Sequence, residues 1–153
     1  MENAVRQRGV EFLVHFTQIS NLESILTQGI KPVSDLEGMI EFNQNDNNRF
    51  DDCRDASCFS IEFPNYKYFY PLRLADHSVD WVVLGIRREV LWEKDCLFCK
   101  ENAASNNVRF ISRDDRRGIQ ALNGMYGEFP GKPSRQQLGI PDSFPTHGSF
   151  SNW

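Results

Sequence analysis

Apolar residues gather in short stretches whose spacing predicts strands. Residues 11–16 are mostly apolar, and residues 57–63 alternate small or polar side chains with apolar ones. Residues 79–86 contain the longest apolar run of the chain. A further short strand is predicted at 96–99, where the sequence is Cys-Leu-Phe-Cys. The pattern therefore predicts a small sheet built from short strands.

Helical signals fall between these stretches. Ser20 and Glu23 have the spacing of a capping box, and apolar residues follow at helical intervals, which predicts a helix over 20–28. A turn of helix is predicted at 88–92, and a loop followed by a helix over 112–127. These helices do not alternate regularly with the strands, so the sequence predicts an α+β fold in a single domain spanning 1–153.

Other segments carry less regular patterns. Residues 35–56 are polar, acidic and rich in Asn, which indicates irregular structure. Five aromatic residues lie between Phe63 and Tyr70. They predict a helix or turn that packs on the core, although stacking on nucleic-acid bases is the alternative. From Gly127 onward, prolines and glycines leave no regular pattern.

Composition places the chain among ordinary globular proteins. Hydrophobic residues make up 40% of the 153 residues and charged residues 25%. No apolar run approaches the roughly 18 residues of a membrane span, and the N-terminus lacks the apolar region of a signal peptide. We therefore expect no membrane association and a cytoplasmic location.

Charge is unevenly distributed. The net charge is −4, whereas a protein that only binds phosphate backbones would be basic. Residues 1–85 hold 7 basic and 13 acidic residues, but residues 86–153 hold 10 and 8. Candidate nucleic-acid-binding residues in the second half are Arg113, Arg116, Arg117, Lys132 and Arg135. A solvated helix start, with the neighbouring aspartates as partners, is an equally good interpretation of this segment.

Metal and common nucleotide motifs are not supported. Cys96 and Cys99 have the spacing of a metal pair, but Cys53 and Cys58 lie far upstream with four residues between them. We expect reduced thiols and no metal. The sequence contains no GxGxxG, Walker, HExxH or GxSxG motif.

Candidate binding chemistry begins at the first predicted strand. His15 and Thr17 flank Phe16 where this strand gives way to a helix, and they could hydrogen-bond an amide or a ribose. A core histidine with an incidental threonine is the alternative. Arg49 stands in the polar loop, where a guanidinium suits a diphosphate or carboxylate, unless it is only a solvated charge.

Taken in order, several segments resemble the DarT-type ADP-ribosyltransferase toxins. The resemblance extends from about residue 12 to about residue 147. Its segments are Val14-His15-Phe16-Thr17, Asn21 to Leu26 with Gly29-Ile30, Arg49 to Asp52, Ser60 to Tyr66, Leu138 to Asp142, and Phe144-Pro145-Thr146.

The resemblance implies a fold and an activity. It implies a split, mostly antiparallel β core with short flanking helices. It also implies transfer of ADP-ribose from NAD⁺ to a base of single-stranded DNA, commonly thymine, with release of nicotinamide. A macrodomain antitoxin of the DarG type is the implied partner. By motif position, His15, Phe16, Thr17 and Ser24 bind the cofactor. Arg49 contacts NAD⁺ and takes part in proton handling, which makes it the catalytic candidate.

One family feature is not found in these residues. The family segment that resembles Pro141 to Thr146 continues into a strand carrying Gln-Ala-Glu, whose glutamate is catalytic. Here residues 147–153 contain no glutamate, and the last one is Glu128. We expect the chain to end before the catalytic strand and to be weakly active or inactive. The alternatives are a non-catalytic remnant that binds NAD⁺, nucleic acid or an antitoxin, and an unrelated small binding module.

Overall fold

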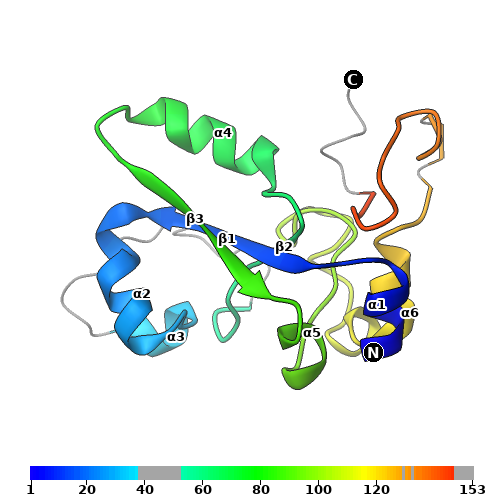
Figure 1. Ribbon diagram of the computed structural model, residues 1–153, viewed down its shortest axis with the longest axis horizontal. Coiled ribbons are helices and arrows are strands. Elements are labelled where there is room, and N and C mark those ends of the chain that lie inside the picture. The colour runs from blue at the N-terminus through cyan, green and yellow to red at the C-terminus, as the bar shows by residue number, and fades with distance from the viewer. Residues whose placement is uncertain (38–52, 129, 132, 147–153) are drawn as a thin grey trace.

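A three-stranded antiparallel sheet organises the molecule. The structure, a computed structural model, describes residues 1–37, 53–128, 130–131 and 133–146. Strand β1 (Phe12–Gln18) lies between β2 (Ser60–Ile61) and β3 (Trp81–Arg87), with short helices around them (Figure 1). The α+β class predicted from the sequence is confirmed.

The two sides of β1 are paired to very different extents. All seven residues of β1 pair with β3, from Phe12 opposite Arg87 to the other end of the strand. Only two residue pairs join β1 to β2. The strand predicted over 57–63 is therefore much shorter than expected. Glu62 adopts φ 63°, a left-handed conformation that turns the backbone out of the sheet.

Helices account for most of the remaining regular structure. The α-helices are α1 (Glu2–Gln7), α2 (Leu22–Gln28), α3 (Val33–Leu36), α4 (Tyr66–Ala75), α5 (Val90–Glu93) and α6 (Gly118–Gly124), and the 3-10 helices are η1 (Ile19–Asn21) and η2 (Asp114–Arg116). The helices predicted at 20–28, 88–92 and 112–127 are present, and the aromatic cluster is helical. Neither α1 nor α3 was predicted.

Two local predictions are wrong. The capping box is not formed, because a 3-10 turn precedes α2 and places Asn21, rather than Ser20, at the N-cap. The strand predicted at 96–99 is also wrong. Its Phe98 N–H donates to the carbonyl of Arg116 at 2.7 Å, so this segment is held by η2 rather than by a strand.

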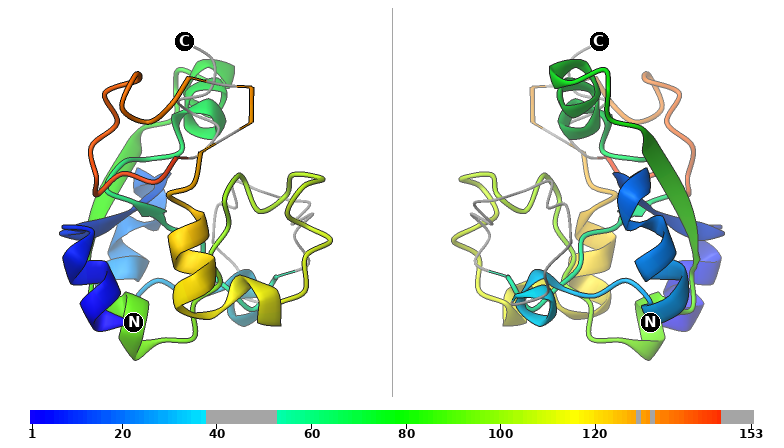
Figure 2. Two further views of the ribbon diagram at one scale, coloured as in Figure 1. Left: turned by 90° about the vertical axis from the view of Figure 1, so that its right-hand side faces the viewer. Right: turned by 90° about the vertical axis from the view of Figure 1, so that its left-hand side faces the viewer.

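The main core lies on one face of the sheet, between β1 and helices α1, α5 and α6 (Figure 2). Its buried members are Val5, Val10, Leu13, Ile61, Leu91, Phe98, Leu122 and Tyr126. Helix α1 supplies Val5, which is completely buried, so this unpredicted helix is an integral part of the core.

Helix α4 covers the opposite face of the sheet (Figure 1). The ring of Phe16 stacks on Phe69 with centroids 4.3 Å apart, and Phe69 meets Trp81 edge-on at 5.4 Å. No helix in the described ranges is long and apolar enough to cross a membrane. The four cysteines, all within these ranges, form no disulfide.

Candidate functional site

The alternation of side chains along β1 divides the His15-Phe16-Thr17 motif between two faces. Successive residues of a strand point to opposite sides, so His15 and Thr17 share the face of Leu13, a core residue. Phe16 points the other way, onto Phe69 of α4. The structure therefore brings together His15 and Thr17 but places the ring of Phe16 across the sheet from them.

His15 is held in one tautomer. Its Nδ1 lies 2.9 Å from the carbonyl oxygen of Cys58, and its ring tilts against that of Phe59 with centroids 5.5 Å apart. A carbonyl can only accept, so Nδ1 carries the proton. Burial lowers the pKa of His15, and the bond to Cys58 only partly opposes this effect. The neutral ring therefore offers Nε2 as a hydrogen-bond acceptor.

Thr17 is tied to the start of the following helix. It is 4% exposed, and its Oγ1 accepts a hydrogen bond from Nδ2 of Asn21 at 2.9 Å. The carbonyl of Asn21 in turn accepts from Oγ of Ser24 at 3.0 Å. Asn21 thus connects two predicted site residues. Asn21 was not among the predicted site residues, although its position four residues after Thr17 was the available signal.

Arg49, the predicted catalytic residue, lies outside the described residues, so its approach to His15 stays a prediction. The residues on either side of segment 38–52 are close together. Glu37 and Arg54 form an ion pair, and the N–H of Ser34 donates to the carbonyl of Arg54 at 2.9 Å. The two ends of the segment that carries Arg49 are therefore fixed next to one another.

Two of the predicted DNA-binding arginines are compensated by carboxylates. Arg113 pairs with Asp55, and Arg117 pairs with Asp95 and Asp114 at 2.7 Å each. The hydrogen bond that Arg113 donates to Asp55 raises the pKa of Arg113, and the one that Arg117 donates to Asp95 raises the pKa of Arg117. A phosphate at either guanidinium would have to compete with these partners.

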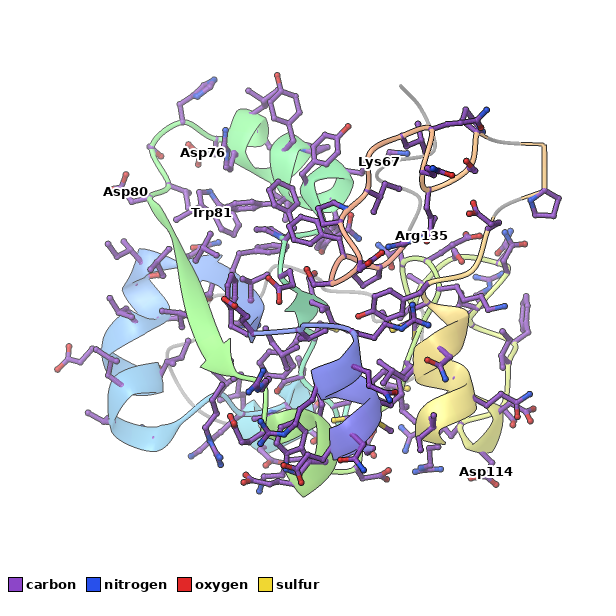
Figure 3. The ribbon with its side chains drawn as sticks, turned by 45° about the vertical axis from the view of Figure 1, so that its right-hand side comes forward. Lys67, Asp76, Asp80, Trp81, Asp114 and Arg135 are labelled. Carbon is purple, nitrogen blue, oxygen red and sulfur yellow. The ribbon has the colours of Figure 1, made fainter. Side chains whose placement is uncertain are left out.

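The side chains of Arg116 and Arg135 contact other parts of the protein. Arg116 is only 5% exposed, and its Nη2 lies 3.8 Å from Sγ of Cys53. Arg135 donates to the carbonyl of Pro141 at 2.8 Å and to Oγ1 of Thr146, which fastens the C-terminal loop. Figure 3 shows Arg135 and Asp114 of η2 well apart, with α6 between them. The four described arginines do not form one patch, and Lys132 lies outside the described residues.

Glu128, the last glutamate of the sequence, takes part in the same loop. Both of its carboxylate oxygens accept from the backbone N–H of Arg135, at 3.2 and 3.0 Å. The carboxylate therefore closes a turn of the C-terminal segment.

One comparison with known proteins identifies a family. A family model described as "ssDNA thymidine ADP-ribosyltransferase, DarT" matches residues 14–126, well over half of the chain. The match begins in β1 and ends just after α6, so it contains His15, Thr17 and the described part of the basic segment up to Arg117. No curated protein matches the chain.

Proposed function

Because the chain belongs to the DarT family of single-stranded-DNA thymidine ADP-ribosyltransferases, we propose that it binds NAD⁺ and directs ADP-ribose to a thymine base of single-stranded DNA. The observation that carries this proposal is the placement of His15 and Thr17 side by side on one face of the central strand. Hydrogen bonds to Cys58 and Asn21 fix the orientations of the His15 ring and the Thr17 hydroxyl, respectively.

The chemistry of these groups suits a dinucleotide. The Nε2 lone pair of neutral His15 accepts from a ribose hydroxyl or from a carboxamide N–H₂. Thr17 accepts from Asn21 and can still donate its O–H to a ribose oxygen, whereas Ser24, whose O–H donates to the carbonyl of Asn21, can accept from a ribose hydroxyl. The ring of Phe16 contributes indirectly, because its stacking on Phe69 fixes β1 and thereby the two residues beside it.

Arg49 is proposed as the charged member of the site. A guanidinium pairs bidentately with phosphate oxygens, and it stays protonated at all physiological pH values. We assign to Arg49 the contact with NAD⁺ and a part in the proton handling of the acceptor base, in which its positive charge stabilises the base as the proton leaves. The support is its motif position in the family and the fixed ends of its segment at Glu37 and Arg54.

The rate of transfer depends on a carboxylate. Departure of nicotinamide develops positive charge on the ribose, which a nearby negative group stabilises. Residues 129–153 contain no glutamate, and Glu128 already accepts from Arg135. We therefore propose that a polypeptide of these 153 residues binds NAD⁺ but transfers ADP-ribose slowly. The expected rate is lower by a factor on the order of 10²–10³ than with such a carboxylate in place. The proposed partner is a DarG-type macrodomain antitoxin that removes the modification.

The test measures binding and transfer separately. Calorimetry gives the NAD⁺ affinity of the wild type, His15→Ala and the control His77→Ala, which changes an exposed histidine near α4. We expect His15→Ala alone to weaken binding, by about tenfold or more. Labelled NAD⁺ with thymine-containing and thymine-free oligonucleotides, followed by mass spectrometry, measures transfer. Absence of NAD⁺ binding by the wild type, or equal binding by His15→Ala, would overturn the proposal.

A further inference from the structure

Helix α4 presents its side chains in two very different ways. Phe69 points toward the sheet and is 8% exposed. Tyr66, Tyr70 and Leu74, spaced four residues apart, are 36%, 52% and 49% exposed. Residues at this spacing share one face of a helix. The aromatic cluster therefore both fills the core and forms an outward stripe.

The outward stripe is a consequence of how α4 is anchored. Phe69 packs between Phe16 of β1 and Trp81 of β3, with centroid distances of 4.3 and 5.4 Å. These contacts fix the rotation of α4 about its axis. Tyr66 and Tyr70 therefore keep part of each ring exposed to solvent.

Basic side chains flank the tyrosines. Lys67 and Arg73 lie on α4, three residues before and after Tyr70, and the helix contains no acidic residue from 66 to 75. This stands out in a chain of net charge −4 whose first 85 residues are strongly acidic. Figure 3 shows Lys67 near one end of α4 and Asp76, which directly follows the helix in the sequence, at the other. The guanidinium of Arg73 lies 5.4 Å from the ring centroid of Phe69, so positive charge borders the exposed aromatic surface on the side of Phe69.

We propose that the outward face of α4 binds the single-stranded DNA substrate, with bases stacked on Tyr66 and Tyr70 and phosphates near Lys67 and Arg73. This inference rests on the proposed function, which supplies the DNA. Aromatic surface next to cations is the usual means of holding unpaired bases. Tyr66 and Tyr70 are one helical turn apart, about 6 Å along the axis, a step that a flexible single strand can span.

The position of this face determines which step it affects. Helix α4 covers the Phe16 face of β1, whereas His15 and Thr17 lie on the other. The tyrosines therefore hold DNA away from the proposed NAD⁺ site. Their loss should raise the Kd for DNA without changing the affinity for NAD⁺.

The experiment uses fluorescence anisotropy of a labelled oligothymidine with the full 153-residue chain. Each of Tyr66→Ala and Tyr70→Ala should raise the Kd about tenfold, which is within the range for loss of one stacked base. Tyr70→Phe should bind as the wild type does, because it keeps the ring, whereas Tyr70→Leu should bind as weakly as the alanine variant. Leu26→Ala, on the 74%-exposed Leu26 of α2, is the matched surface control. Thermal melts verify folding, and calorimetry verifies NAD⁺ binding.

The outcomes separate the two proposals. Unchanged DNA affinity in the double variant, which carries both Tyr66→Ala and Tyr70→Ala, overturns the assignment of this face while leaving the proposed function intact. The same holds if Tyr70→Leu binds as well as the wild type, if a duplex competes as well as a single strand, or if the double variant changes only the oligomeric state. No DNA binding by the wild type would count against the proposed function itself.

Discussion

Replacing His15 by Asn and by Ala separates the two hydrogen-bonding atoms of its ring. In the native chain, Nδ1 donates to the carbonyl of Cys58 at 2.9 Å, and Nε2 is left as an acceptor. An asparagine amide can donate in place of Nδ1–H but carries nothing at the position of Nε2. Alanine removes both. We expect both variants to lose NAD⁺ affinity by about tenfold or more, but to differ in stability.

The size of the stability effect follows from the contacts of the ring. A neutral hydrogen bond contributes about 1 kcal/mol, and an aromatic pair such as His15 with Phe59 contributes about 0.5–1.5 kcal/mol. His15→Ala should therefore lower the free energy of unfolding by about 2 kcal/mol. His15→Asn keeps the bond to Cys58 and should lose about half as much.

The pH dependence supplies an independent check. Burial lowers the pKa of His15 in the folded chain below the 6.5 of an unperturbed histidine. The unfolded chain therefore takes up a proton first as the pH falls. The folded state loses stability from pH 6.5 down to the folded pKa and keeps it fully above that range. Neither variant should show this contribution.

Urea denaturation at pH 8 and pH 5.5, with calorimetry of NAD⁺ binding at pH 8, measures all three effects. If His15→Asn binds NAD⁺ as tightly as the wild type, Nε2 is not part of the site. If His15→Ala is as stable as the wild type at pH 8, the bond to Cys58 contributes nothing, and the argument for a fixed tautomer fails.

Three further substitutions test other parts of the structure. Thr17→Val removes the acceptor of the Asn21 amide and should lower both the free energy of unfolding, by about 1–2 kcal/mol, and the affinity for NAD⁺. Thr17→Ser should keep the NAD⁺ affinity, and equal affinities of the valine and serine variants would show that the hydroxyl does not contact NAD⁺. Phe69→Ala should lower the free energy of unfolding by about 3–5 kcal/mol in urea denaturation followed by tryptophan fluorescence, and a loss below about 1 kcal/mol would contradict the packing of α4. Arg117→Glu tests the predicted basic interface by salt titration of DNA binding. Because Asp95 already compensates this arginine, the slope should fall by less than the ~0.7 of one full phosphate contact, and a larger fall would show that DNA displaces the aspartate.

Strands β1 and β3 were predictable from the sequence because their residues are mostly apolar, whereas the length of β2 was not. The apolar stretches 11–16 and 79–86 cover most of β1 and β3, and these two strands pair residue by residue. Strand β2 does not extend as predicted, because the backbone of Glu62 is left-handed, and nothing in a glutamate side chain signals this conformation. Helix α1 escaped prediction because only Ala4 and Val5 of its six residues are apolar.

The candidate site was predictable where neighbouring residues define it. The period of a strand is enough to place His15 and Thr17 on one face, and the spacing of Asn21 from Thr17 is that of a local contact. Arg116 was not predictable, because it contacts Cys53, which is 63 residues away in the sequence. An arginine in a charged run is normally solvated, and only the tertiary fold shows that this one is buried.

Strand β1 also bears on how such a protein could change its target. Its odd-numbered residues from Leu13 to Thr17 face one side, and its even-numbered residues face α4. Substitution of the exposed tyrosines of α4 during evolution would alter the side chains available to a nucleic acid. The residues that surround His15 on the other face of β1 would remain unchanged. Under the two proposals above, a new target sequence or polymer would leave the proposed NAD⁺ site unchanged. A grafted α4 that retains Phe69 keeps the stacking on Phe16, through which the helix is anchored to β1.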